Sequence, residues 1–305
     1  MRARGKFVLA AVGGVAVAGT AFVVACGDRT GLDALVGSSS ANVEDAGDAA
    51  RQVQPVVCRN AGVQYIYVVS EENELYSYYP PTAEFTDVGT INCPAPAGDT
   101  PFSMAVDRQG NAYVVFQQGD LFHVSMKTAA CEATPFVPNQ HGFVNFGMGF
   151  VANQGDAGET LFVVPDTMRG QPSVLATIDL TSFTLNEVAS FANPAISAAE
   201  LTGTGDGKLY GFFAQDSMAP PSFIVQIDPQ NADILEQYTL NGDIQGTAWA
   251  FGFWGGNFYT FTAPDGVTSV VTEYSPSTGT TTQVATAPQG VLLVGAGVST
   301  CAPTR

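Results

Sequence analysis

A short hairpin unit that recurs along the chain constrains its fold more than any other feature. The first clear copy, FSMAVDRQGNAYVVF at residues 102–116, has an apolar run, a turn at Gly110 and Asn111, and a second run rich in β-branched and aromatic residues. Gly and Asn tolerate the positive φ of tight turns, whereas β-branched and aromatic residues favour strands. We therefore expect a β-hairpin at this position.

Copies of this unit return every 44 to 53 residues, and their aligned first strands begin at Ser103, Gly147, Glu200 and Trp249. A second pair of strands follows the first hairpin, and we expect it at residues 121–124 and 133–137. Four short strands in a repeat of roughly 40–50 residues form the blade of a β-propeller. One alignment column holds Ala105 and Gly149, as expected for inner strands crowded around a central axis.

The end of the chain supplies the inner strand that its first repeat lacks. That repeat begins with a second strand at residues 64–69, and residues 292–298 have the character of an inner strand, with Gly295 in the column of Ala105 and Gly149. Closure of the ring removes exposed sheet edges. The sequence thus predicts an all-β domain at residues 56–305, a propeller of about five four-stranded blades closed by a C-terminal strand.

The N-terminus has the pattern of an export signal. Arg2, Arg4 and Lys6 precede an uncharged apolar run at residues 7–24, and the sequence VVAC at residues 23–26 resembles the lipobox of bacterial lipoproteins. The resemblance implies a signal peptide at residues 1–25, cleavage before Cys26, and acylation of Cys26 with chains such as palmitate, which anchor a protein to a membrane. A plain secretory signal and a retained membrane helix are the alternatives.

Residues 26–55 are rich in Gly, Ser, Ala and Asp, and we expect a disordered tether there. The formal net charge of the whole chain is −17, and removal of residues 1–25 makes it −20. A surface of this charge repels nucleic acid, so no nucleic-acid partner is expected. The expected location is the bacterial cell envelope, facing the periplasm or the cell surface.

Four cysteines remain once Cys26 is set aside as the lipidated residue. An even number in an exported protein favours disulfides over the alternative of buried free thiols. Cys58 precedes the second strand of the first blade and Cys301 follows the closing strand, so we predict a Cys58–Cys301 disulfide. Cys93 and Cys131 are then left as the second pair.

No catalytic, cofactor or metal site can be assigned from motifs. HExxH and GxSxG are absent, and GTGDGK at residues 203–208 departs from a phosphate loop, so we interpret it as a turn between two strands. Glu200 and Trp249, with Ser103 at the same level of the aligned inner strands, form the candidate ligand site, where a carboxylate and an indole would hold a cation or a sugar ring. The alternative is that Trp249 packs between blades and Glu200 caps a turn.

Two stretches resemble known propeller repeats. VDRQGNAYVV at residues 106–115 resembles the D-x-x-G-N-x-Y-V signature of bacterial NHL and SMP-30-like repeats. GGNFYTF at residues 255–261, followed by EYSPSTG at residues 273–279, resembles a kelch-type blade that lacks its usual Trp. The resemblance implies a propeller but no activity, because the metal-binding carboxylates of SMP-30-like enzymes have no match here residue by residue.

The expected function is therefore a lipid-anchored binding module with a protein or carbohydrate partner. The alternative is a hydrolase or lactonase acting at the channel mouth, which would need several polar groups converging there. The first position of the aligned inner strands has one carboxylate, Glu200, and this favours binding over catalysis.

Overall fold

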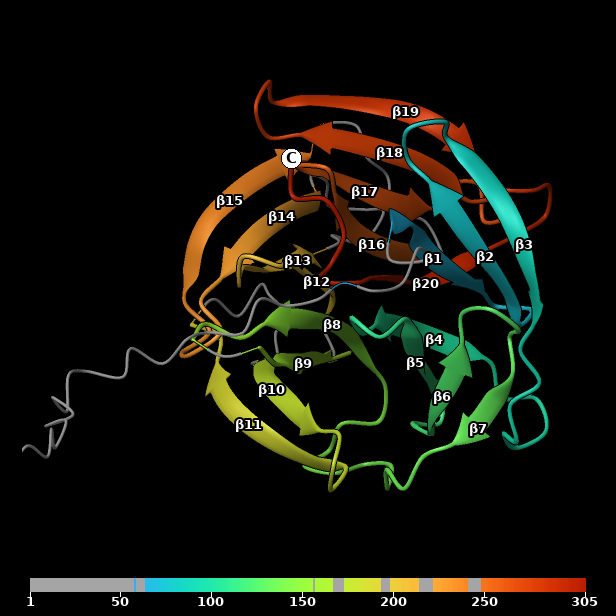
Figure 1. Ribbon diagram of the computed structural model, residues 1–305, viewed down its shortest axis with the longest axis vertical. Coiled ribbons are helices and arrows are strands. Elements are labelled where there is room, and N and C mark those ends of the chain that lie inside the picture. Colours follow the sequence, from blue (N-terminus) through green and yellow to red (C-terminus); the bar gives the residue numbers. More distant parts are fainter. Residues whose placement is uncertain are drawn as a thin grey trace, which may run out of the picture. The chain divides into compact units, whose positions relative to one another are not determined.

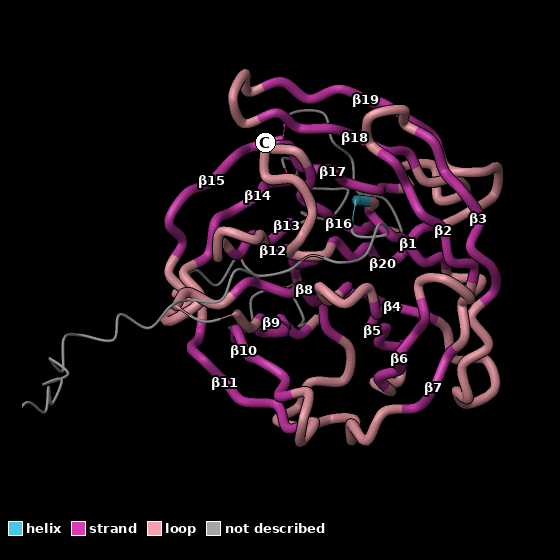
Figure 2. The backbone as a smooth tube through the Cα atoms, viewed as in Figure 1, coloured by secondary structure: helices cyan, strands magenta, loops and turns pink. Residues whose placement is uncertain are grey.

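The computed structural model describes residues 58, 64–155, 157–166, 173–192, 198–213, 222–240 and 248–305. The predicted signal peptide at residues 1–25 and the whole predicted tether at residues 26–55, with Cys26, lie outside the described residues. The described chain consists of strands joined by loops and turns, apart from a short helical piece at Gln64 (Figure 2).

Twenty strands form five four-stranded antiparallel sheets arranged as the blades of a ring (Figure 1). From the axis outward, blade 1 contains β20 (Leu293–Val298), β1 (Ile66–Ser70), β2 (Glu74–Tyr79) and β3 (Glu84–Thr90). Blade 2 contains β4 (Pro101–Val106), β5 (Asn111–Phe116), β6 (Leu121–Ser125) and β7 (Cys131–Ala133). Blade 3 contains β8 (Phe146–Ala152), β9 (Glu159–Pro165), β10 (Val174–Asp179) and β11 (Thr184–Ser190).

Blade 4 contains β12 (Ala199–Gly203), β13 (Leu209–Phe213), β14 (Ser222–Ile227) and β15 (Ile234–Leu240). Blade 5 contains β16 (Trp249–Trp254), β17 (Asn257–Thr262), β18 (Val270–Ser275) and β19 (Thr280–Thr286). The inner strands contact one another in the cyclic order β4, β8, β12, β16, β20 and back to β4, which closes the ring.

The predicted closure by the C-terminal strand is confirmed. β20 pairs antiparallel with β1, and the register matches Ile66 with Val298 and Val68 with Ala296. The first blade therefore combines the last strand of the chain with the first three. All five sheets have an inner strand from the expected region of the sequence.

The hydrophobic core is divided into five clusters, and each cluster lies between two neighbouring blades. Between blades 4 and 5, for example, the ring of Tyr210 stacks on Phe253 and meets the edge of Phe258. Strands of this kind are buried on both faces, so their sequences are apolar almost throughout rather than alternating. This explains runs such as the fully buried β8 and β13.

Glycines on the inner strands let the backbones of neighbouring blades approach each other closely. A β-carbon on Gly147 would overlap the carbonyl of Ala199, and one on Gly149 would lie 2.9 Å from the carbonyl group of Leu201. The prediction of small residues around the axis is therefore confirmed for β8. The backbones of β8 and β12 are therefore in direct contact beside the axis.

Two details of the sequence prediction are wrong. The outer strand of blade 2 is Cys131–Ala133 instead of residues 133–137, because Thr134 already ends the ladder with bonds from its amide and its hydroxyl to the carbonyl of Leu121. On the inner strands, Gly295 lies against the peptide group between Ser103 and Met104, one residue short of the contact with Ala105 that the alignment implies.

Candidate functional site

The structure brings the three predicted ligand-site residues to one end of the ring. Ser103, Glu200 and Trp249 all lie near the starts of inner strands, in β4, β12 and β16. Because the inner strands run in the same direction, their starts meet at one mouth of the axis, which we call the Glu200 mouth. Whether a ligand binds there stays a prediction.

Ser103 and Glu200 contact each other across the ring, although blades 2 and 4 are not neighbours. The Ser103 hydroxyl donates a hydrogen bond of 2.8 Å to Oε2 of Glu200. β8 lies between these strands, and Gly147 on β8 packs directly against the backbone of Ala199 and Glu200. Since Gly147 has no side chain, the carboxyl group of Glu200 has room to reach Ser103.

Glu200 and Trp249 line the same cavity, which has a volume of about 110 Å³. Its other lining residues are Phe102, Gln117, Ala248 and Val294. Glu200 is only 2% exposed and lies within a strand, so the alternative that it caps a turn is wrong. Trp249 does pack against the cluster between blades 4 and 5, as the alternative proposed, and it lines the cavity as well.

Burial raises the pKa of the Glu200 carboxyl well above its usual range, and the nearby Asp166 raises it further, while the hydrogen bond from Ser103 acts in the opposite direction. Asp166 follows the end of β9 and is exposed at the rim, where partial desolvation raises its own pKa. Glu200 therefore retains a proton at pH values at which an exposed glutamate has lost it.

Three residues of this mouth were not predicted from the sequence. Phe102, Gln117 and Asp166 come from the start of β4, the turn after β5 and the end of β9. A narrow cleft beside the cavity is lined by Asp166, Glu200 and Trp249 together. Glu200 is the one carboxylate at the first position of the aligned inner strands, and Asp166 adds a second carboxylate from outside those strands. The sequence alignment compared only the inner strands, so it could not include Asp166, which follows the second strand of blade 3.

At the opposite end, which we call the Thr300 mouth, the chain's last described residues lie across the ends of the inner strands. Thr300 donates a 2.8 Å hydrogen bond to Glu159 of blade 3 and accepts one of 3.2 Å from Arg108 of blade 2. The amide of Gly255 in blade 5 donates a 2.7 Å bond to the carbonyl of Pro303. This segment therefore connects three blades besides its own.

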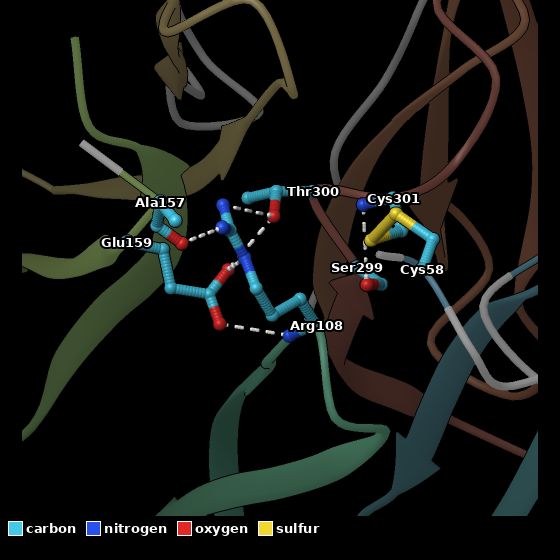
Figure 3. The surroundings of a disulfide bond; sticks show 7 residues. All are labelled: Cys58, Arg108, Ala157, Glu159, Ser299, Thr300 and Cys301. Atoms are coloured by element: carbon cyan, nitrogen blue, oxygen red, sulfur yellow. Dashed lines mark hydrogen bonds and ion pairs between the residues drawn. A yellow bond between two sulfur atoms is a disulfide. The ribbon is translucent and has the colours of Figure 1, made fainter. Parts of the chain in front are cut away.

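A buried ion pair lies at the centre of the Thr300 mouth (Figure 3). Nε of Arg108 lies 3.4 Å from Oε2 of Glu159, the Arg108 amide donates a 2.8 Å bond to Oε1, and the guanidinium also donates to the carbonyl of Ala157. Burial raises the pKa of Glu159, and the bonds from Arg108 and Thr300 oppose that rise. These contacts hold three parts of the ring together.

Both predicted disulfides are present. Cys58 is bonded to Cys301 beside this ion pair, with Cα atoms 5.7 Å apart (Figure 3). Cys93 is bonded to Cys131, with Cα atoms 4.9 Å apart. The first disulfide joins the start of the domain to the segment that follows the closing strand, and the second connects blade 1 to the outer strand of blade 2.

The described residues also form a larger groove, of about 680 Å³, between blades 3 and 4. It contains the stretch with a superficial likeness to a phosphate loop, which is a turn between β12 and β13 as predicted. Nζ of Lys208 lies 3.4 Å from Asp206 within that turn, so its charge is already paired. None of the predicted site residues lines this groove.

The part of the chain that the structure describes contains no group of three or more His, Cys, Asp or Glu side chains able to hold a metal ion. Within the same residues, no helix is long and apolar enough to cross a membrane.

Comparison with known proteins gives a similarity of fold only. No protein-family profile and no curated protein matches the sequence. A protein of unknown function from Bacteroides caccae is 12% identical, with a TM-score of 0.38 over 73% of each chain. A chain of a nidogen/laminin complex is 12% identical, with a TM-score of 0.42 over 76% of this chain and 84% of the other. A chain of a mitotic checkpoint complex is 11% identical, with a TM-score of 0.37 over 85% of this chain and 77% of the other. These similarities are too low to transfer a function.

Proposed function

We propose that this protein is an exported, lipid-anchored binding module of the bacterial cell envelope, and that it binds its ligand at the Glu200 mouth. The observation that supports this most directly is that Glu200 and Trp249 line one cavity at the starts of the inner strands, where Ser103 donates a hydrogen bond to the Glu200 carboxyl group. Binding sites combine apolar and aromatic walls with a few converging polar groups, and perturbed carboxyl groups cluster in them.

The contacts at the Thr300 mouth also favour the Glu200 mouth as the ligand-binding end of the ring. At the Thr300 mouth, the last described residues cover the ends of the inner strands, and the polar side chains of Arg108, Glu159 and Thr300 bind one another through hydrogen bonds and an ion pair. At the Glu200 mouth, a carboxyl group and two aromatic side chains face a cavity. A ligand can therefore gain contacts at the Glu200 mouth without breaking existing ones.

Export and anchoring rest on the N-terminal sequence, and the two disulfides accord with an oxidising compartment. The test is the substitution Cys26→Ala in the full chain, followed by fractionation of the cells. We expect the variant to leave the membrane fraction or to remain unprocessed, and mass spectrometry of the wild type to find acyl chains on Cys26. An unmodified Cys26 in the mature wild type would contradict the anchoring.

Binding at the mouth is tested separately, by capture of envelope carbohydrate and protein on the immobilised full chain. Trp249→Leu should lose the captured component, whereas Trp254→Phe at the other end of β16 is the matched control and should retain it. Equal capture by the Trp249→Leu variant and the wild type would place the interaction elsewhere.

One observation favours a second candidate, the hydrolase or lactonase. Glu200 and Asp166 line one cleft, and two carboxyl groups with different environments are the usual means of acid–base chemistry. This candidate predicts turnover of chromogenic lactones or esters that is lost in Glu200→Gln. A binding module predicts no turnover by either protein.

A further inference from the structure

The two ends of the ring each contain a buried glutamate, and among the described residues only Glu159 has a cationic partner. Glu159 is paired with Arg108 at the Thr300 mouth. Glu200, which is more deeply buried, accepts a hydrogen bond from the neutral Ser103 and has Asp166 as its charged neighbour. Among the described residues that line its cavity and the adjoining cleft, there is no Lys, Arg or His.

A buried carboxylate without a positive partner is costly, so an isolated one keeps its proton instead. A neutral amide or an apolar residue would fill the same space in β12 without this cost. The cost disappears when a cation enters the cavity, because the carboxylate then has a counter-charge in a region of low dielectric constant, where the attraction is strong.

The remaining walls suit a cation with an organic substituent. Trp249 and Phe102 are half-buried aromatic side chains that line the cavity, and the faces of such rings attract ammonium groups. Val294 and Ala248 contribute apolar surface, and Gln117 contributes an amide. The volume of about 110 Å³ has room for roughly four water molecules, which corresponds to a small head group rather than a sugar ring with all its hydroxyls.

We infer that the Glu200 mouth binds an alkylammonium group, with the Glu200 carboxylate as its counter-ion and Trp249 and Phe102 as its aromatic walls. This inference rests on the proposed function and specifies its ligand. The ammonium enters as the cation, the proton of the Glu200 carboxyl group leaves to solvent, and the bound state contains one carboxylate–ammonium pair. The acidic surface of the protein attracts such ligands at long range.

Binding must then depend on pH. The affinity for the ammonium rises with pH, because the Glu200 carboxyl group then loses its proton more readily. Asp166 is the charged group that faces Glu200, and its ionised carboxylate attracts the same ligand from the rim. The residues that β4, β16 and β20 present to the cavity, Phe102, Trp249 and Val294, are uncharged, and so is Ser103, which bonds to Glu200. Protons are released on binding at pH values where empty Glu200 is protonated.

The experiment uses the full chain in a non-ionic detergent. The chain has two tryptophans, so in a Trp254→Phe background the indole fluorescence reports Trp249 alone. n-Butylammonium is titrated as a free amine and Nα-acetyl-lysine amide as a peptide-borne one, with n-butanol as the neutral isostere. Calorimetry in phosphate and in HEPES, which have different ionisation enthalpies, measures the protons released.

We expect at least one of the two amines to bind and n-butanol to bind at least about tenfold more weakly. Glu200→Gln should reduce amine affinity at least about tenfold and abolish proton release, while Glu132→Gln on the exposed edge of blade 2 removes the same charge and should change neither. If Glu200→Gln fails to fold, the inference is still tested by the proton release that the protein with an intact Glu200 shows on binding an amine.

Equal binding of n-butanol and n-butylammonium, unchanged amine affinity in Glu200→Gln, or the absence of proton release would each overturn the inference. The inference can fail while the proposed function stands. In that case the wild type captures an envelope component that Trp249→Leu does not capture, and neither amine displaces this component. Failure of both amines together with equal capture by Trp249→Leu removes both.

Discussion

Removal of the Cys58–Cys301 disulfide should destabilise the domain more than removal of Cys93–Cys131. The perturbation is the double substitution Cys58→Ser with Cys301→Ser, compared with Cys93→Ser with Cys131→Ser as the matched control. The two disulfides close loops of 243 and 38 residues. Loop-closure entropy then predicts stabilisation of about 5.5 kcal/mol for the long loop and about 4 kcal/mol for the short one.

The assay is urea denaturation of the oxidised proteins, followed by fluorescence and circular dichroism. Without the Cys58–Cys301 bond, the pairing of β20 with β1 still closes the ring, so a folded baseline is expected. The difference between the two double variants should be about 1.5 kcal/mol, and the urea dependence should increase most for the long loop, because its unfolded chain expands most. An equal or smaller loss for the Cys58/Cys301 variant would refute the reasoning.

Three further predictions concern the axis and its two ends. Gly147→Ala places a methyl group on the carbonyl of Ala199 and should lower the free energy of unfolding by about 3 kcal/mol, measured in urea. Arg108→Met leaves Glu159 buried without its partner and should cost about 3–5 kcal/mol, whereas the further change Glu159→Leu should recover part of that loss. Burial raises the pKa of both Glu159 and Glu200 in the folded state. Each protonated carboxyl group therefore contributes fully to the free energy of unfolding below the pKa of an unfolded glutamate, and this contribution is lost as the pH rises through the pKa of the folded state. Glu200→Gln should therefore flatten the decline of the urea midpoint as the pH rises above the pKa of an unfolded glutamate, and an unchanged slope would contradict this assignment.

The architecture was predictable because each blade repeats its own sequence signals. Turn residues at Gly110 and Asn111, the small side chains around the axis, and the unmatched strand at the end of the chain all indicated a closed ring. The pairing of Cys58 with Cys301 followed from that closure. Each of these features depends on local chemistry or on the order of strands along the chain.

The remaining details depend on contacts between blades. The contact of Gly295 with the peptide group between Ser103 and Met104 joins two backbones, so the hydrophobic pattern of β20 contains no signal for it. Asp166 is an ordinary residue at a strand end, and only the packing of blade 3 beside blade 4 brings it near Glu200. The bond between Ser103 and Glu200 crosses an intervening blade, and sequence spacing contains no signal for it.

The Cys58–Cys301 bond also determines how the ring responds to mechanical force. A pull on the chain ahead of Cys58 is transmitted through the disulfide to Cys301, so it reaches β20 and β1 at the same end of their shared ladder. Without that covalent link, the same pull would act on β1 alone and separate it from β20 one hydrogen bond at a time. With the link intact, the two strands that close the ring bear the force together, so a pull on the chain ahead of Cys58 does not separate β1 from β20 one hydrogen bond at a time.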